Sequence, residues 1–303
     1  MDPAHRVRAQ NPDKEFRHDL RRCGFITCYE APAMSTDRQP TIFLSHGGGP
    51  CFWIAFPEPF GPHAFDKLRD YLAGLIDTLP SRPKAILAIS AHWEAPLPTV
   101  GTAANPGMLF DYYGFPEHTY RLSYPAPGSP ELAARVRNLL EGAGIATATD
   151  PKRGFDHGVF VPFLIVDPEA KIPVATLSLQ QDLDPARHIA IGAALAPLRD
   201  EGILIVGSGN SFHNLRSFLD GDGRAAAAFD GWLVEAATAP DPAVRNARLL
   251  EWEQAPCARA CHPREEHLLP LMVAAGAAGN DIGRRVFADA IGGKAISGFA
   301  FGG

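Results

Sequence analysis

The chain has 303 residues, of which 46% are hydrophobic and 20% charged, and its formal net charge is −6. This apolar content is enough to build a large buried core, whereas the scattered lysines and arginines exclude a protein that attracts nucleic acid or an anionic membrane through a basic surface. The five cysteines form an odd set without the density of a disulfide framework, and no apolar span of about 18 residues is present. We therefore expect a cytoplasmic protein.

Along the chain, apolar runs typical of strands alternate with amphipathic segments typical of helices. Residues 1–39 are polar and lack periodicity, so we expect a flexible N-terminal extension there. Strands are predicted at residues 42–44, 85–89, 172–179 and 203–206, and helices at 64–79, 130–141, 185–199, 225–239 and 263–275. Because near-continuous apolar strands belong to sheets covered on both faces, residues 40–303 are predicted to form a single α/β domain with a mostly parallel central sheet and helices on both faces.

Three of the predicted strands end in the same way, with a small residue followed by a histidine. The segments "TIFLSHGGGP", "AILAISAHWE" and "ILIVGSGNSFHN" place His46, His92 and His213 at or just beyond the carboxyl ends of their strands. Strand ends of this kind converge at one edge of an open α/β sheet, where the functional crevice lies. A single histidine there is more simply a hydrogen-bonded structural residue, but three imidazoles at one edge predict a site for zinc or iron.

The three glycines after His46 permit two interpretations. A glycine-rich turn can expose backbone N–H groups to a phosphate, but here no Lys-Ser/Thr pair follows and Pro50 removes one donor. The simpler interpretation is that Gly47–Gly49 let another group approach the backbone closely.

The segment "GFDHGVFVP" places His157 beside Asp156, just before an apolar run. Asp156 can orient the imidazole for chemistry, or His157 can be an ordinary turn histidine, and the residues alone leave both interpretations open.

The segment "CHPREEHLLPL" gathers His262, Glu266 and His267 at the start of the helix predicted over residues 263–275. In a helix, His267 lies about 100° around the axis from Glu266, so only one of the two is expected to point into a shared site.

These segments also carry a family resemblance. From about Pro40 to the C-terminus, "FLSHGGGP", "SAHWE", "DYYGFPEHTYRLSYPAPGSPEL", "GFDHGVFVP", "GSGNSFHNLR" and "HPREEHLLPL" follow one another as they do in the class III extradiol ring-cleavage dioxygenases. The chain resembles in particular the DOPA 4,5-dioxygenase (DODA-type) branch of the LigB superfamily. The resemblance implies a catalytic domain over residues 40–303, a non-haem metal in a pocket at one sheet edge, and an enzyme that opens a small catecholic substrate, DOPA-like or related, with both atoms of O₂.

The resemblance also implies roles for individual residues. Its metal ligands are the histidines that match the family motifs, His46, His92 and His267. His213 matches a histidine that contacts either metal or substrate, and His157 matches the acid/base histidine. Other branches of the superfamily use a glutamate as third ligand, which makes Glu266 the alternative to His267. Tyr120, in the long aromatic loop, and His262 are expected to contact the substrate.

Extradiol cleavage needs a metal with several open coordination positions, so Fe(II) held by three side chains is the expected cofactor, with Zn(II) as the second possibility. The same imidazoles suit a zinc-dependent hydrolase, in which a metal-bound water works beside a His or Glu base. A metal-binding protein without catalytic activity is a third class. Neither nucleic acid nor a membrane is an expected partner.

Overall fold

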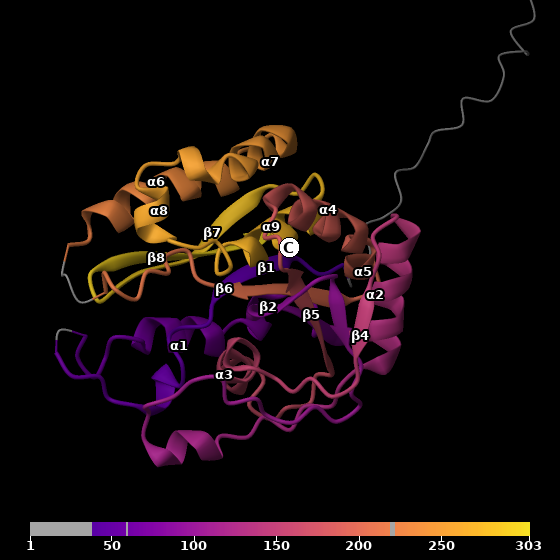
Figure 1. Ribbon diagram of the computed structural model, residues 1–303, viewed down its shortest axis with the longest axis horizontal. Helices are drawn as coiled ribbons and strands as arrows, with labels where there is room; N and C mark the ends of the chain where they lie inside the picture. Colours follow the sequence, from indigo (N-terminus) through magenta and orange to yellow (C-terminus); the bar gives the residue numbers. More distant parts are fainter. Residues whose placement is uncertain (1–37, 59, 219–221) are drawn as a thin grey trace, which may run out of the picture. The chain divides into compact units, whose positions relative to one another are not determined.

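The described residues form one eight-stranded sheet with the strand order β4-β3-β5-β2-β6-β1-β8-β7 (Figure 1). The structure is a computed structural model, and it describes residues 38–58, 60–218 and 222–303. The strands are β1 (Thr41–Ser45), β2 (Ala85–Ala95), β3 (Thr99–Gly101), β4 (Ala148–Asp150), β5 (Val174–Gln180), β6 (Ile203–Gly209), β7 (Gly283–Ile291) and β8 (Lys294–Phe301). The predicted extension lies outside the described residues except for its last two positions.

The centre of the sheet is parallel. Strands β5, β2, β6 and β1 pair in parallel, and β5, β6 and β1 are buried along their whole length. These are the four strands that the sequence predicts, because burial on both faces gives each of them a near-continuous apolar run. Antiparallel pairs occur farther out, between β3 and β5, β1 and β8, and β8 and β7. The predicted α/β fold with a mostly parallel central sheet is confirmed.

The hairpin of β7 and β8 is not anticipated by the sequence analysis. Strand β7 reads "GRRVFADAI" and is partly exposed, as befits an edge strand, so it lacks the continuous apolar run of the central strands. Its two-residue loop, Gly292–Gly293, has positive φ at both positions (+55° and +78°), which suits the tight turns that favour glycine pairs. The Gly-Gly pair between two short runs is the signal that would have identified the hairpin.

Helices cover both faces of the sheet, as predicted. They are α1 (Asp66–Ala73), α2 (Pro130–Gly142), α3 (His157–Val166), α4 (Pro185–Leu195), α5 (Pro197–Asp200), α6 (Arg224–Ala237), α7 (Pro242–Leu250), α8 (Ala258–Cys261) and α9 (Leu269–Ala278). Short 3₁₀ segments lie at Cys51–Trp53, Ile76–Thr78, Glu117–Arg121 and Trp252–Gln254. Figure 1 shows α9 and α4 on one side of the central strands and α1 and α3 on the other. In the described part of the chain, no helix combines the length and the apolar character that a membrane span requires.

Helix α9 fixes one edge of the site. All of its residues are buried, and it packs directly on β6 and β1. The approach to β6 is close enough that a β-carbon on Gly207 would lie 2.3 Å from Pro270 O, and one on Gly209 would lie 2.1 Å from His267 O. At the other end, the buried guanidinium of Arg245 donates to Ala275 O and Gly279 O, which satisfies carbonyl groups that the helix end leaves without partners.

The start of α9 differs from the prediction. Residues 263–268 form turns, and the helix begins only at Leu269, with Pro270 in its first turn. The sequence contains two prolines that suit a helix start, at positions 263 and 270, and only the close packing of α9 on β6 selects the second. Glu266 and His267 therefore lie in a loop, and the helical angle expected between their side chains does not apply.

Candidate metal centre and active site

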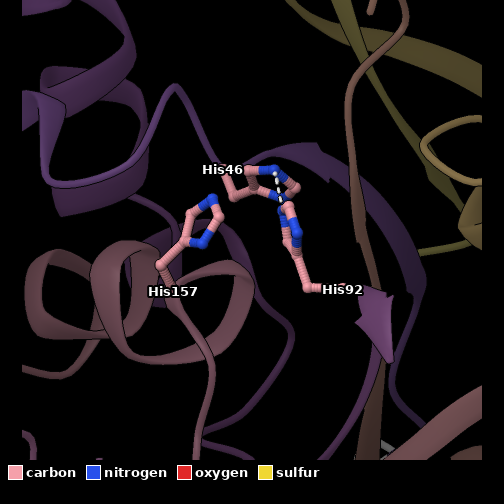
Figure 2. Close-up of side chains that lie close together, drawn as sticks. All are labelled: His46, His92 and His157. Carbon is pink, nitrogen blue, oxygen red and sulfur yellow. Dashed lines mark hydrogen bonds between the residues drawn. The ribbon is translucent and has the colours of Figure 1, made fainter. Parts of the chain in front are cut away.

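Five histidines from separate parts of the chain meet at the carboxyl edge of the central strands. They are His46 directly after β1, His92 within β2, His157 at the first position of α3, His213 in the loop after β6, and His267 two residues before α9. Figure 2 shows His46, His92 and His157 pointing toward one another from their three elements. Buried strands ending in small residues bring the first two together, because parallel strand ends share one edge.

The distances are those of a single cluster. The ring centroids of His46, His92 and His267 lie 4.8–5.2 Å from one another. His157 lies 3.9 Å from His92, and His213 stacks on His267 at 3.3 Å. The structure therefore brings together five of the six histidines that the sequence analysis places in the site, all except His262.

The donor atoms fit a metal ion. Two groups of three residues each have ligand atoms within 4.8 Å of one another, namely His46, His92 and His157 in one group and His213, Glu266 and His267 in the other. The Nε2 atoms of His46 and His92 are 3.1 Å apart. Two nitrogens bound to one ion at about 2.0–2.1 Å and at nearly a right angle have a separation of roughly 3 Å. The residues present can thus hold a metal.

Burial keeps the central imidazoles neutral, as a metal ligand must be. Desolvation, followed by the positive charge that neighbouring histidines would carry, lowers the pKa of His46 and of His267 well below the usual value. Burial also lowers the pKa of His92 to about 3, with a smaller effect of His157 in the same direction. At neutral pH these rings therefore keep a lone pair for coordination.

Three of the clustered imidazoles, His46, His213 and His267, have a partner on the Nδ1 atom. The Ser208 hydroxyl lies 3.1 Å from Nδ1 of His46. The Glu266 carboxylate lies 2.8 Å from Nδ1 of His267 and 3.2 Å from Nδ1 of His213. Partners of this kind fix the tautomer and the ring orientation of a histidine that binds a metal through its other nitrogen. Because the structure places Glu266 against two imidazoles, its carboxylate is positioned to orient ligands.

Asp111 is the functional residue that the sequence analysis misses. Its Oδ1 atom lies 2.8 Å from Nδ1 of His157 and accepts the backbone N–H of the same residue at 3.0 Å. Burial would raise the pKa of Asp111, but the hydrogen bond from His157 and the neighbouring imidazoles outweigh it and hold the pKa below its usual value. Asp111 lies in the long aromatic loop, and its only sequence signal is an acid among aromatic residues in "MLFDYYGF".

Asp156, the neighbouring acid that the sequence left as one possible partner of the His157 ring, has other partners. It accepts hydrogen bonds from Ser90 Oγ at 2.6 Å and from Arg153 at 2.8 Å, beneath the site. The side chain of an N-cap residue and that of the following residue point in different directions, so adjacency in sequence does not make Asp156 the partner of the His157 ring.

The cluster lies in a cavity of about 800 Å³. His46, His92, His157, His213, Glu266 and His267 all line it, together with Asp111, Tyr112 and Gly47–Gly49. A β-carbon on Gly49 would lie 2.9 Å from the ring of Phe115, so this glycine lets a side chain of the protein itself pack closely; the approach of a metal or substrate to these glycines stays a prediction.

Two expected substrate contacts do not line this cavity. Tyr120 lies behind Tyr112, with ring centroids 5.2 Å apart, and it is Tyr112 that borders the cavity. His262 is fully buried elsewhere, where its Nε2 atom donates to Ser211 O at 2.9 Å and its ring contacts Phe229 and Trp252. A histidine can serve either as a hydrogen-bonded core residue or as a ligand, so its place beside a functional segment of the sequence does not show which of the two it is.

Comparison with known proteins agrees with this geometry. The family described as the catalytic LigB subunit of aromatic ring-opening dioxygenase matches residues 41–300. The chain is 47% identical to a 4,5-DOPA dioxygenase extradiol of Beta vulgaris over 80% of this chain and 87% of that protein. It is 39% identical to the dioxygenase tasH of Hapsidospora irregularis, over 87% and 86% of the two chains. The crystal structure of an uncharacterized protein from Escherichia coli K12 superimposes with a TM-score of 0.69 at 31% identity, over 88% of this chain and all of that one.

These similarities give no support to the zinc hydrolase that the histidines alone would permit. The match to the LigB family spans nearly all of the described residues, including all those that line the cavity. The chain belongs to the LigB family of extradiol ring-cleavage dioxygenases, in the DODA-type branch.

Proposed function

We propose that this dioxygenase opens the ring of a catecholic substrate with O₂ by means of one Fe(II) ion held by His46, His92 and His267. The cluster of neutral imidazoles at the edge of the cavity is the observation that carries the proposal. The related proteins of Beta vulgaris and Portulaca grandiflora are named 4,5-DOPA dioxygenases, so we extend a catechol substrate to this chain. The domain boundary near Pro40 and a cytoplasmic location also stay predictions.

The choice of ligands rests on which atoms are already engaged. Glu266 Oε1 lies against Nδ1 of both His267 and His213, which ties the carboxylate to two imidazoles, while Oε2 lies 3.6 Å from Arg264 Nη1, beyond hydrogen-bond distance. We therefore assign Glu266 to orientation and His267 to coordination. Held by His46, His92 and His267, Fe(II) would supply both Lewis-acid chemistry and redox chemistry with O₂, whereas Zn(II) would supply only Lewis-acid chemistry. His213, more exposed than His267, is assigned to the side of the site where substrate enters.

His157 has the geometry of the acid/base. A carboxylate only accepts hydrogen bonds, so the contact with Asp111 places the proton of the neutral ring on Nδ1 and leaves the lone pair on Nε2. In our proposal, Nε2 of His157 removes the second phenolic proton of the bound catechol and later returns a proton to the opening ring. Help of this kind is typically worth about 10²- to 10⁴-fold in rate.

The test uses protein purified without oxygen and reloaded with Fe(II) or Zn(II). With Fe(II) we expect O₂ uptake and a yellow ring-opened product from 4-methylcatechol, and with Zn(II) we expect neither. His46→Ala should lose both iron and activity, whereas His157→Ala should keep iron and lose most turnover. Equal turnover with zinc would contradict the assignment of iron, and loss of iron from His157→Ala would show that His157 is a ligand.

A further inference from the structure

The cavity is lined by two chemically different groups of residues. One group is the histidine cluster, and the other is an apolar region that we call the aromatic lobe. The aromatic lobe consists of Phe56, Phe60, Phe65, Phe212, Phe218 and Ile296. These residues come from three distant segments, the loop before α1, the loop after β6 and the β7–β8 hairpin. The proposed reaction at the metal uses none of them.

The lobe is one continuous surface of rings. Phe65 lies 5.2 Å from Phe56, Phe56 lies 5.8 Å from Phe60, and Phe60 lies 6.0 Å from Phe218. Phe218 in turn lies 5.2 Å from Phe212 at an angle of 88°. Centroid distances of 4.5–7 Å with tilted or edge-on planes are the arrangement that aromatic side chains prefer. The segments therefore hold one another in place, and the faces left open border the cavity.

Phe65 joins the lobe to the histidine cluster. A β-carbon on Gly47 would lie 3.7 Å from Phe65 Cδ1, and one on Gly48 would lie 4.0 Å from Phe65 Cζ. These two glycines directly follow His46, so the wall of the lobe begins one residue beyond a proposed ligand. A ring bound at the histidine cluster can thus extend a substituent into the lobe without leaving the cavity.

No charged side chain belongs to the aromatic lobe, and the charged side chains elsewhere in the cavity form ion pairs within the protein. Apart from histidines, the described lining residues include four charged side chains, Glu94, Asp111, Arg264 and Glu266. Arg264 donates to both carboxylate oxygens of Glu94, with a distance of 2.6 Å for the Nη2–Oε2 contact. Asp111 is paired with His157, and Glu266 with His213 and His267. A zwitterionic side chain placed in the lobe would lose its hydration and gain no partner, which is costly.

From this arrangement we infer that the aromatic lobe is a substrate subsite for an aryl or similarly bulky apolar substituent on the catechol ring. The inference rests on the proposed function and adds the substrate class to it. A cavity of about 800 Å³ belongs to the range of roughly 300–1,000 Å³ in which proteins bind ligands much larger than a single dihydroxylated ring. The lobe accounts for the volume that the catechol ring itself leaves over.

The first experiment compares kcat/KM of the Fe(II)-loaded enzyme for 4-methylcatechol, L-DOPA and the two phenylcatechols substituted at ring positions 3 and 4. The better phenylcatechol should exceed L-DOPA by at least about tenfold, because one ring buried against aromatic walls removes much apolar surface from water. If the enzyme opens 4-methylcatechol but prefers L-DOPA to both phenylcatechols, the inference is overturned while the proposed function stands. If no catechol is opened, the proposed function fails first.

A second measurement does not depend on turnover. Calorimetric titration of metal-free protein should show binding of a phenylcatechol that is at least about tenfold tighter than that of 4-methylcatechol. Equal affinities for the two compounds would refute the subsite even if the metal had been misassigned.

Two variants then locate the effect. Phe218→Ala should lower the ratio of kcat/KM for the phenylcatechol to that for 4-methylcatechol by about tenfold, because it removes one ring from the wall. Trp232→Ala is the matched control, since Trp232 is a partly buried aromatic residue on α6 outside the cavity. An unchanged ratio in a folded Phe218→Ala protein, or an equal change in the Trp232 variant, would contradict the inference.

Discussion

Replacing Asp111 by asparagine tests whether this carboxylate positions the proposed acid/base. The variant keeps an oxygen that can accept the backbone N–H of His157, so the start of α3 should be preserved. The same oxygen, Oδ1, faces Nδ1 of His157 at 2.8 Å, so the variant retains a hydrogen-bond acceptor there but loses its negative charge. The bond that keeps the ring proton on Nδ1 is then no longer assisted by charge, so the lone pair that the reaction needs on Nε2 is held less firmly.

The magnitude follows from the charge-assisted bond that is lost. A hydrogen bond to a charged group is worth about 1.5–3 kcal/mol, which corresponds to roughly 10- to 150-fold. We therefore expect kcat for 4-methylcatechol to fall by about 10²-fold in Asp111→Asn, with little change in KM and with iron content unchanged. Initial rates of O₂ uptake and iron analysis on the same preparation measure all three quantities.

The control is a His–Asp pair of similar geometry outside the site. His63, three residues before α1, has its Nδ1 atom 2.7 Å from Oδ2 of Asp66, the first residue of α1; both side chains are exposed, and Asp66→Asn should leave kcat unaltered. A normal kcat in Asp111→Asn would refute the role of Asp111 as the positioning residue. A loss of iron would instead assign it to metal binding.

Three further predictions concern the scaffold that holds the site. Gly209→Ala places a β-carbon against His267 O, so it should lower the affinity for iron and reduce the free energy of unfolding by about 1–3 kcal/mol. Iron titration and urea unfolding measure the two effects. Unaltered iron binding would mean that the close approach of α9 to β6 does not determine the position of His267. Arg245→Met on α7 leaves carbonyl groups at the end of α9 without donors and should reduce the free energy of unfolding by roughly 2–4 kcal/mol. Arg248→Met, also on α7, removes only an exposed ion pair with Glu235 and should change this free energy by less than about 1 kcal/mol. Burial lowers the pKa of His262 to about 4, so the fold is fully stable with respect to this residue above pH 6.5 and loses up to about 1.4 kcal/mol per pH unit as pH falls from 6.5 toward 4. The free energy of unfolding, measured with urea at pH 7, 6 and 5, should therefore fall less steeply with decreasing pH in His262→Gln than in the wild-type protein. An equal dependence on pH in the two proteins would refute the reasoning.

The sequence by itself determined the central part of the fold and the histidines of the cluster. Strands β1, β2, β5 and β6 are buried on both faces, and such strands must be apolar along nearly their whole length, which makes them visible in one sequence. The histidines that end these runs are visible for the same reason, because a polar residue directly after a buried strand marks the sheet edge. The family resemblance added the roles that we propose for His157 and His267.

Only the tertiary structure decided how these residues are supported and what else the cavity contains. The partner of His157 is Asp111, 46 residues away in a loop without periodicity, and not the adjacent Asp156. His262 is as close in sequence to the motif as His267, yet it lies in the core. The aromatic lobe joins three segments, and in the sequence their phenylalanines cannot be distinguished from ordinary core residues. Side-chain direction in loops depends on long-range packing, and local patterns carry no record of which distant side chains face one another.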